Sequence, residues 1–120
     1  MIKEIATVAI YVSDQKAAEE FWVNKVGFEV RAKHEMGHGT FWLEVAPPKN
    51  QSRLVLFPKN LMHNWAEKKP SIVFFCDDID KTYLYLKSRG VDVGPEPQKM
   101  SWGNYATFKD PDGNEFLLKS

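Results

Sequence analysis

The side chains that most often do chemistry in proteins are few in this sequence. The histidines are His34, His38 and His63. His34 and His38 are four residues apart, a spacing that aligns two metal ligands on a helix. Gly37 and Gly39 predict a hairpin here instead. We therefore expect His34 and His38 to be exposed loop residues, with His63 in a connection, and no metal site.

Two carboxylates, Glu44 and Glu115, lie in predicted strands and are the candidates for a relocated metal ligand or general base. For Glu115, a salt bridge with Lys119 at the rim of a sheet is the simpler reading. Cys76 is the only cysteine, so an internal disulfide is excluded. It follows the apolar run 72–75, which is typical of a thiol that behaves as a small hydrophobe, and no histidine nearby would activate it.

Aromatic side chains are the more prominent group, at 13% of the residues. Flat rings stack on planar or cationic ligands, and each such pair contributes about 1 kcal/mol. An apolar concavity with few polar groups is the usual composition of a small-molecule pocket. For any single ring, filling the core or packing a dimer interface is an equal alternative. The candidate ligand-binding residues are Tyr11, Trp42, Phe57, Phe75, Trp102 and Tyr105.

Length and charge limit the classes of protein to consider. At 120 residues and 13.8 kDa the chain fits one ordinary domain. Lysines and arginines are scattered and the net charge is zero, which argues against nucleic-acid binding. The sequence contains neither a long apolar span nor a signal-peptide run, so we expect no membrane segment and a cytoplasmic location.

The elements that must position these residues occur in two similar sets. In the first, strands are predicted over 5–12, 28–33, 40–46 and 53–58, with a helix over 15–26 that Asp14 caps and Gly27 ends. In the second, strands are predicted over 71–77, 91–93, 104–109 and 115–119, with a helix that begins at Ile79, is capped by Asp78 and ends at Gly90. The turn 110–113 has the Asp-Pro-Asp-Gly sequence of a hairpin.

The two sets align with one another at offsets of 62 to 64 residues, which predicts a duplicated βαβββ unit. We therefore expect a single α+β domain over 1–120, with module one at 1–58, a connection at 59–70 and module two at 71–120. Its two modules would form a mixed curved sheet with a central cup and with the helices on the outer face.

Alternation along the strands predicts which side chains point into the cup. The helix side takes Val8, Ile10 and Val12, with Ile72, Phe74 and Cys76 as their counterparts in module two. The opposite parity faces the cup. Strand 40–46 fits either phase, and we favour Trp42 and Glu44 in the cup. The other residues with cup parity are Thr7, Ala9, Tyr11, Val55, Phe57, Ser71, Val73, Phe75, Tyr105, Thr107, Leu117 and Lys119.

The order of elements resembles the vicinal oxygen chelate superfamily of glyoxalases, bleomycin-resistance proteins and ring-cleaving dioxygenases. The motifs that carry the resemblance cover nearly the whole chain: Val12-Ser13-Asp14, Phe21-Trp22, Val26-Gly27-Phe28, Trp102-Gly103 and the closing segment 108–114. The resemblance implies two modules packed edge to edge, often across a dimer interface, and we expect a homodimer.

Metal-dependent relatives resembling glyoxalase I place four ligands at positions that fall here on Thr7, Val55, Ser71 and Leu117. None of these is a histidine or a carboxylate. The sequence therefore predicts no metal, no cofactor and no catalytic residue. It favours a metal-independent protein that binds a small apolar or aromatic molecule, as the drug-sequestering bleomycin-resistance proteins do. The alternatives are a glyoxalase-like lyase, isomerase or dioxygenase with a rearranged metal site, and a structural module whose own rings fill the cup.

Overall fold

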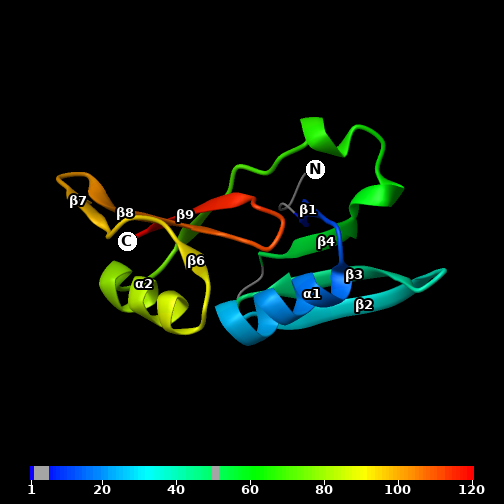
Figure 1. Cartoon of the computed structure of the whole chain (residues 1–120), viewed down its shortest axis with the longest axis horizontal. Coiled ribbons are helices and arrows are strands. Elements are labelled where there is room, and N and C mark those ends of the chain that lie inside the picture. The colour runs from blue at the N-terminus through cyan, green and yellow to red at the C-terminus, as the bar shows by residue number, and fades with distance from the viewer. Residues whose placement is uncertain (2–5, 50–51) are drawn as a thin grey trace. The chain divides into compact units, whose positions relative to one another are not determined.

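The computed structural model describes residues 1, 6–49 and 52–120, which form two units, Met1–Pro70 and Ser71–Ser120. The first unit contains β1 (Val8–Val12), α1 (Gln15–Glu20), a π-helical segment (Phe21–Val26), β2 (Glu29–Gly37), β3 (Thr40–Ala46) and β4 (Leu54–Pro58). Its strands lie in the order β1-β4-β3-β2, with β1 parallel to β4 and the other pairs antiparallel (Figure 1). This is the predicted βαβββ arrangement.

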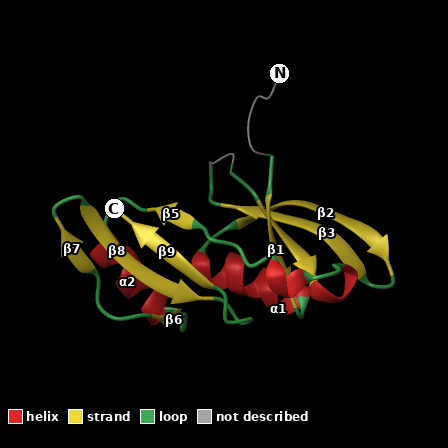
Figure 2. Cartoon of the chain, turned by 90° about the horizontal axis from the view of Figure 1, so that it is seen from above, coloured by secondary structure: helices red, strands yellow, loops and turns green. Residues whose placement is uncertain are grey.

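The second unit repeats this arrangement with one additional strand. It contains β5 (Val73–Phe75), α2 (Ile79–Ser88), β6 (Asp92–Val93), β7 (Gln98–Met100), β8 (Gly103–Lys109) and β9 (Glu115–Lys119). The strand order is β5-β9-β8-β6, with β5 parallel to β9, and β7 also pairs with β8. Helix α2 lies along one face of this sheet (Figure 2). The predicted α+β class with two βαβββ modules is therefore confirmed.

Short polar side chains begin both helices, as expected. The Asp14 carboxylate accepts from the Ala17 amide at 3.1 Å, and the Asp78 carboxylate accepts from the amides of Asp80 and Lys81. Each bond satisfies an amide of the first turn that has no partner within the helix. The first helical stretch ends at Gly27, whose φ of 95° is a conformation that glycine adopts without strain.

The predicted helix over 15–26 is regular only in its first half. From Phe21 to Val26 it widens into a π-helix. The neighbours Phe21 and Trp22 are both buried there, with ring centroids 5.3 Å apart. Consecutive residues of a regular α-helix do not share a face. The widened segment is therefore where the helix buries two adjacent rings.

Each unit has its own hydrophobic core between helix and sheet. In the first, Trp22 and Phe21 lie with the helix-side residues of the strands, all at most 6% exposed: Ile10, Val12, Leu43, Val45, Leu54 and Leu56. In the second, Phe74, Phe108 and Phe116 contact one another, with centroids 5.4 to 6.1 Å apart. The burial of Ile10 and Val12 confirms the predicted strand phase, although Val8, which has the same parity, is 38% exposed.

Several predicted boundaries differ from the structure. The first strand begins at Val8, and residue 5 of its predicted range lies outside the described residues. The second strand is longer than predicted and runs to Gly37. Strand 71–77 is reduced to Val73–Phe75. Strand β7 was missed because its three residues, Gln98–Met100, are all exposed and show no apolar alternation. The connection 59–70 carries two 3₁₀ turns, at Lys59–Leu61 and Trp65–Glu67.

In the described part of the chain, no helix has both the length and the apolar character that crossing a bilayer requires.

Candidate ligand-binding face

Three aromatic side chains gather on the face of the first sheet that is turned away from α1. Tyr11 on β1 and Phe57 on β4 are register partners, and their rings meet edge to face at 6.1 Å. Trp42 on β3 meets Phe57 in the same manner at 6.2 Å. Trp42 is 36% exposed. We call this surface, with Tyr11, Trp42, Phe57, Glu44 and Arg53, the aromatic face.

Glu44 supplies the fixed charge of the aromatic face. Its Oε2 accepts from the indole Nε1 of Trp42 at 2.7 Å, and its Oε1 accepts from Nη1 of Arg53 at 2.9 Å. The indole hydrogen bond is the main cause that lowers the pKa of Glu44 below 4.5, and Arg53 adds to it against the opposing effect of burial. The carboxylate is therefore ionised and held by two donors. Trp42, Glu44 and Arg53 thus lie on the same face of the sheet, as the favoured phase of strand 40–46 predicted.

His34 also lies on this side of the sheet, which contradicts its prediction as a loop residue. It stands in β2 directly opposite Trp42, because β2 continues to Gly37. Residues that pair in a strand register point to the same face. Only His38 is in the turn, with a φ of 54°. The glycines suggested an earlier turn than the one the backbone makes.

The corresponding face of the second sheet carries Phe75, Tyr105 and Lys119. Both rings are register partners of Lys119 on β9. The Lys119 ammonium lies 5.7 Å from the ring centre of Phe75 and 5.8 Å from that of Tyr105. Phe75 is 82% exposed. Tyr105 also lines a cavity of about 190 Å³, together with Pro95, Glu96, Gln98, Ala106, Thr107 and Leu117.

Trp102 and Glu115 in the second unit do not lie as predicted. Trp102 lies in the turn before β8 rather than on a strand face and is 70% exposed. The predicted salt bridge between Glu115 and Lys119 is wrong. The two residues are at opposite ends of β9, which puts about 13 Å of strand between them, and the register partner of Glu115 is Lys109.

Cys76 follows β5 and is half-buried. Its Sγ lies 3.6 Å from the carbonyl oxygen of Lys119, and burial raises the pKa of the thiol above 9.0. The thiol therefore stays protonated at neutral pH, which agrees with its prediction as a small hydrophobe.

The positions that bind metal in the glyoxalase I pattern do not fit a metal ion here. Val55 is apolar and 1% exposed, and Leu117 is a second hydrocarbon. Thr7 and Ser71 offer only hydroxyl groups, which are poor ligands for the metals that histidine and glutamate hold. Across residues 6–49 and 52–120, no three histidine, cysteine, aspartate or glutamate side chains converge on one point.

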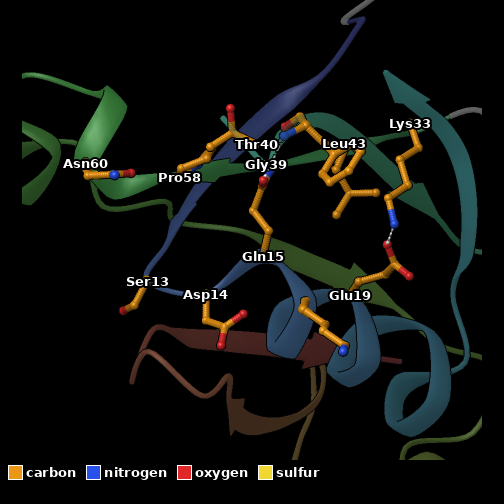
Figure 3. A pocket seen from close by; sticks show the side chains of 12 residues that line it. Ser13, Asp14, Gln15, Glu19, Lys33, Gly39, Thr40, Leu43, Pro58 and Asn60 are labelled. Carbon is orange, nitrogen blue, oxygen red and sulfur yellow. Dashed lines mark hydrogen bonds and ion pairs between the residues drawn. The ribbon is translucent and has the colours of Figure 1, made fainter. Parts of the chain in front are cut away.

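A larger groove, of about 590 Å³, lies on the helix side of the first sheet (Figure 3). It opens between the start of α1, the middle of β2 and the first half of β3. The side chains at its borders come from Ser13, Asp14, Gln15, Lys16, Glu19, Lys33, Thr40, Phe41, Leu43, Pro58 and Asn60, with Gly39.

The polar groups of this groove serve mainly to join α1 to the sheet. Gln15 donates to the carbonyl oxygens of Phe41 and Leu56 at 2.6 and 2.8 Å and accepts from the Phe41 amide at 2.9 Å. Lys33 and Glu19 form an ion pair at 2.9 Å (Figure 3). Because Gln15, Lys33 and Glu19 already have hydrogen-bond or ion-pair partners within the protein, they are not free to bind a ligand. We therefore place the candidate site on the aromatic face rather than in the groove.

The sequence brought Tyr11, Trp42, Phe57 and Glu44 together correctly by strand parity. It missed Arg53 and His34. Arg53 directly precedes β4 and has the parity of Val55 and Phe57, so applying the alternation to the whole predicted strand 53–58 would have found it. His34 could have been found only with the correct length of β2.

Comparisons with known proteins agree with this fold. The family model described as Glyoxalase/Bleomycin resistance protein/Dioxygenase superfamily matches residues 4–118. The uncharacterized protein YetH of Bacillus subtilis (strain 168) is 52% identical over 99% of both chains. A superfamily member from Sphaerobacter thermophilus is 32% identical, with a TM-score of 0.87 over 98% of this chain and 97% of that one.

A further similar structure is TnmS3, described as an antibiotic binding protein from Streptomyces sp. CB03234. It is 33% identical, with a TM-score of 0.82 over 98% of this chain and 95% of that one. The matched motifs, the duplicated βαβββ units and the family model lead to one conclusion. The chain belongs to the glyoxalase/bleomycin resistance protein/dioxygenase superfamily.

Proposed function

We propose that this protein binds a small planar aromatic molecule on its aromatic face and does so without a metal ion. The observation that carries the proposal is the contact of Tyr11, Phe57 and Trp42, which three adjacent strands hold edge to face beside an ionised Glu44. Such rings present flat apolar surface at small entropic cost, since each has only two rotatable side-chain bonds.

The relatives support binding rather than one particular chemistry. TnmS3 is described as an antibiotic binding protein, and it matches this chain over nearly its full length. We infer a similar sequestering role here, in which stoichiometric binding suffices and no reacting group is required. The residues at the family's metal-ligand positions, Thr7, Val55, Ser71 and Leu117, are consistent with this role.

Binding can be tested by titrating a panel of planar aromatic compounds while tryptophan fluorescence and heat of binding are recorded. We expect at least one compound to bind with a stoichiometry near one per site. Trp42→Ala should weaken the binding of that compound by about fivefold, because one stacking partner contributes on the order of 1 kcal/mol. Trp65→Ala is the matched control and should leave the affinity unchanged. A panel with no binding, or equal losses in both variants, would contradict the proposal.

The metal-independent part of the proposal has its own test. Untagged protein purified without chelators should contain far less than one Ni, Zn, Fe or Mn per chain, and added metal should not change the affinity for the aromatic compound. A stoichiometric metal would instead support a glyoxalase-like enzyme, because sites of that kind bind about one ion each.

We also propose that the protein acts as a homodimer in the cytoplasm. Support for the dimer comes from the outermost strand β5, where Val73 is 52% exposed and Phe75 is 82% exposed. Apolar side chains on an edge strand favour association with another sheet edge.

A further inference from the structure

The aromatic face contains one polar cluster that bears on the chemical class of its ligand, and this inference rests on the proposed function. Glu44 stands between Trp42 and Arg53 and is bonded to both. Its side chain is only 13% exposed, whereas that of Arg53 is 39% exposed. The cation is therefore the more accessible member of the ion pair.

The carboxylate of Glu44 is already well satisfied by the protein. Each of its oxygens accepts one short hydrogen bond, at 2.7 and 2.9 Å. Its charge is neutralised by Arg53, and its pKa is lowered by the indole hydrogen bond and then by Arg53. A ligand cation would have to compete with the guanidinium for a mostly buried group, which costs desolvation.

Arg53 has donors to spare. A guanidinium carries five N–H groups in a planar fork, and the ion pair with Glu44 uses one of them at Nη1. Planar forks of this kind favour oxygen acceptors such as carboxylate and carbonyl groups. Glu44 holds the guanidinium in place, so less side-chain freedom is lost when a second acceptor binds.

The geometry fits a ring and an oxygen in one molecule. Through the single carboxylate of Glu44, the indole nitrogen of Trp42 and the guanidinium nitrogen of Arg53 are no more than about 8 Å apart. A fused two-ring aromatic with an oxygen at its edge covers such a span, with its ring against Trp42 and its oxygen at Arg53.

We infer that the ligand of this face is a planar aromatic molecule with an oxygen acceptor at its edge, a carboxylate or a carbonyl, which Arg53 binds while Trp42 contacts the ring. Glu44 is a positioning residue that fixes the two binding groups relative to each other. Aromatic cations are excluded from this class because Arg53 presents free donors to the ligand, whereas the Glu44 carboxylate is mostly buried and already paired with that guanidinium.

Three naphthalene probes substituted at the same ring carbon test the inference by calorimetry: the naphthoate anion, acetylnaphthalene and naphthylmethylammonium. The wild-type protein should bind both oxygen acceptors at least about tenfold more tightly than the cation, since charge-assisted hydrogen bonds are the stronger ones. Whether naphthoate or acetylnaphthalene binds more tightly distinguishes a carboxylate from a carbonyl ligand. This ranking needs no variant, so it does not depend on the folding of a mutant.

Arg53→Gln should reduce the preference for the acceptors over the cation to about one, while Arg89→Gln, the same change on α2, should preserve it. Equal binding of the three probes by the wild-type protein, with loss of all three in Trp42→Ala, would overturn the inference and leave the proposed function standing. Tighter binding of the cation would also overturn it. Binding of none of the probes would count against the inference and the proposed function together.

Discussion

At the scale of single residues, the most informative group is the Glu44 carboxylate, because its hydrogen bonds join the ring of Trp42 to the charge of Arg53. The pKa of Glu44 is lowered, so its ionised form stabilises the folded state. That contribution is present above pH 4.5 and is lost as the pH falls through the lower pKa of the folded protein.

Trp42→Phe should raise the pKa of Glu44 toward 4.5, because phenylalanine keeps a ring and removes the indole donor. An NMR titration of the Glu44 side-chain carboxyl measures this directly. Trp65→Phe removes an indole elsewhere and should leave the pKa of Glu44 unchanged. A pKa that does not respond to Trp42→Phe would show that the indole hydrogen bond does not control the carboxylate.

Asp110 is only 6% exposed. We expect its contribution to stability to depend on pH in the opposite direction to that of Glu44. Burial raises its pKa above 3.8, although its carboxylate accepts from the Asn114 amide and side chain and from the Asp112 amide. Folding therefore favours its protonated form, so its contribution is present below pH 3.8 and is lost as the pH rises through its folded pKa.

The free energy of unfolding of the wild-type protein minus that of Asp110→Asn should accordingly fall as the pH rises from below 3.8. Urea unfolding at a series of pH values measures this difference, and asparagine is the matched neutral side chain. If the free energy of unfolding of the wild-type protein relative to Asp110→Asn increased with pH through this range, the pKa of Asp110 would not be raised by folding.

Strand parity was sufficient to place Tyr11, Trp42, Phe57 and Glu44 on one face from the sequence, because alternation is fixed once one buried residue is known. It could not place His34, since Gly37, His38 and Gly39 all adopt positive φ, and the glycine pattern alone does not show that β2 continues to Gly37. Nor could it reveal the ion pair of Arg53 with Glu44, which joins residues nine apart across two strands.

At the scale of elements, the start of α1 is held to the sheet by the single side chain of Gln15. Its three hydrogen bonds reach the backbone of β3 and β4. This function could not be read from the sequence, where Gln15 follows the cap residue Asp14 and resembles any polar residue of a first helical turn. These hydrogen bonds depend on where the backbone of Phe41 in β3 and of Leu56 in β4 lies relative to the helix.

Gln15→Ala should reduce the free energy of unfolding by roughly 1–3 kcal/mol, because it leaves partly buried backbone groups of Phe41 and Leu56 without this partner. Urea unfolding followed by circular dichroism measures the change. Lys16→Ala, at the exposed next position, is the control and should stay within about 0.5 kcal/mol of the wild type. Equal effects of the two substitutions would mean that Gln15 does not secure the helix.

Sequence patterns predicted most of the helices and strands correctly but not all of them. The order of helices, caps and strands was predicted correctly in both modules except for β7, because Asp14, Asp78 and Gly27 act locally. The π-helical segment was not predicted, since it results from burying Phe21 and Trp22 together against the sheet. Strand β7 has no apolar period and exists through its pairing with β8.

At the scale of the whole molecule, the duplication places aromatic side chains on the corresponding sheet face of each unit, but the polar groups beside them differ. The first combines Trp42 with the Glu44 and Arg53 ion pair, and the second places Lys119 between Phe75 and Tyr105. The two units therefore share their order of helix and strands, but they carry different polar groups on this face.

A homodimer is the expected assembly. Native mass spectrometry should give a mass twice the 13.8 kDa of the chain, with sedimentation giving the same result at micromolar concentration. Phe75→Ser should increase the dissociation constant of the dimer, because Phe75 is the most exposed ring of the edge strand β5. The exposed Leu84→Ser on α2 is a control that should not change it. A compact monomer in both measurements would contradict the assembly.

The central claim is that the aromatic face of the first sheet binds the ligand. Its most direct test is a proton–nitrogen correlation NMR spectrum of the tryptophan indole groups during titration with the naphthoate anion. The Trp42 signal should move in a saturable manner, because its N–H is bonded to Glu44 at the proposed site, while the signal of the fully buried Trp22 should stay in place. Saturable binding that leaves the Trp42 signal unmoved would contradict the claim.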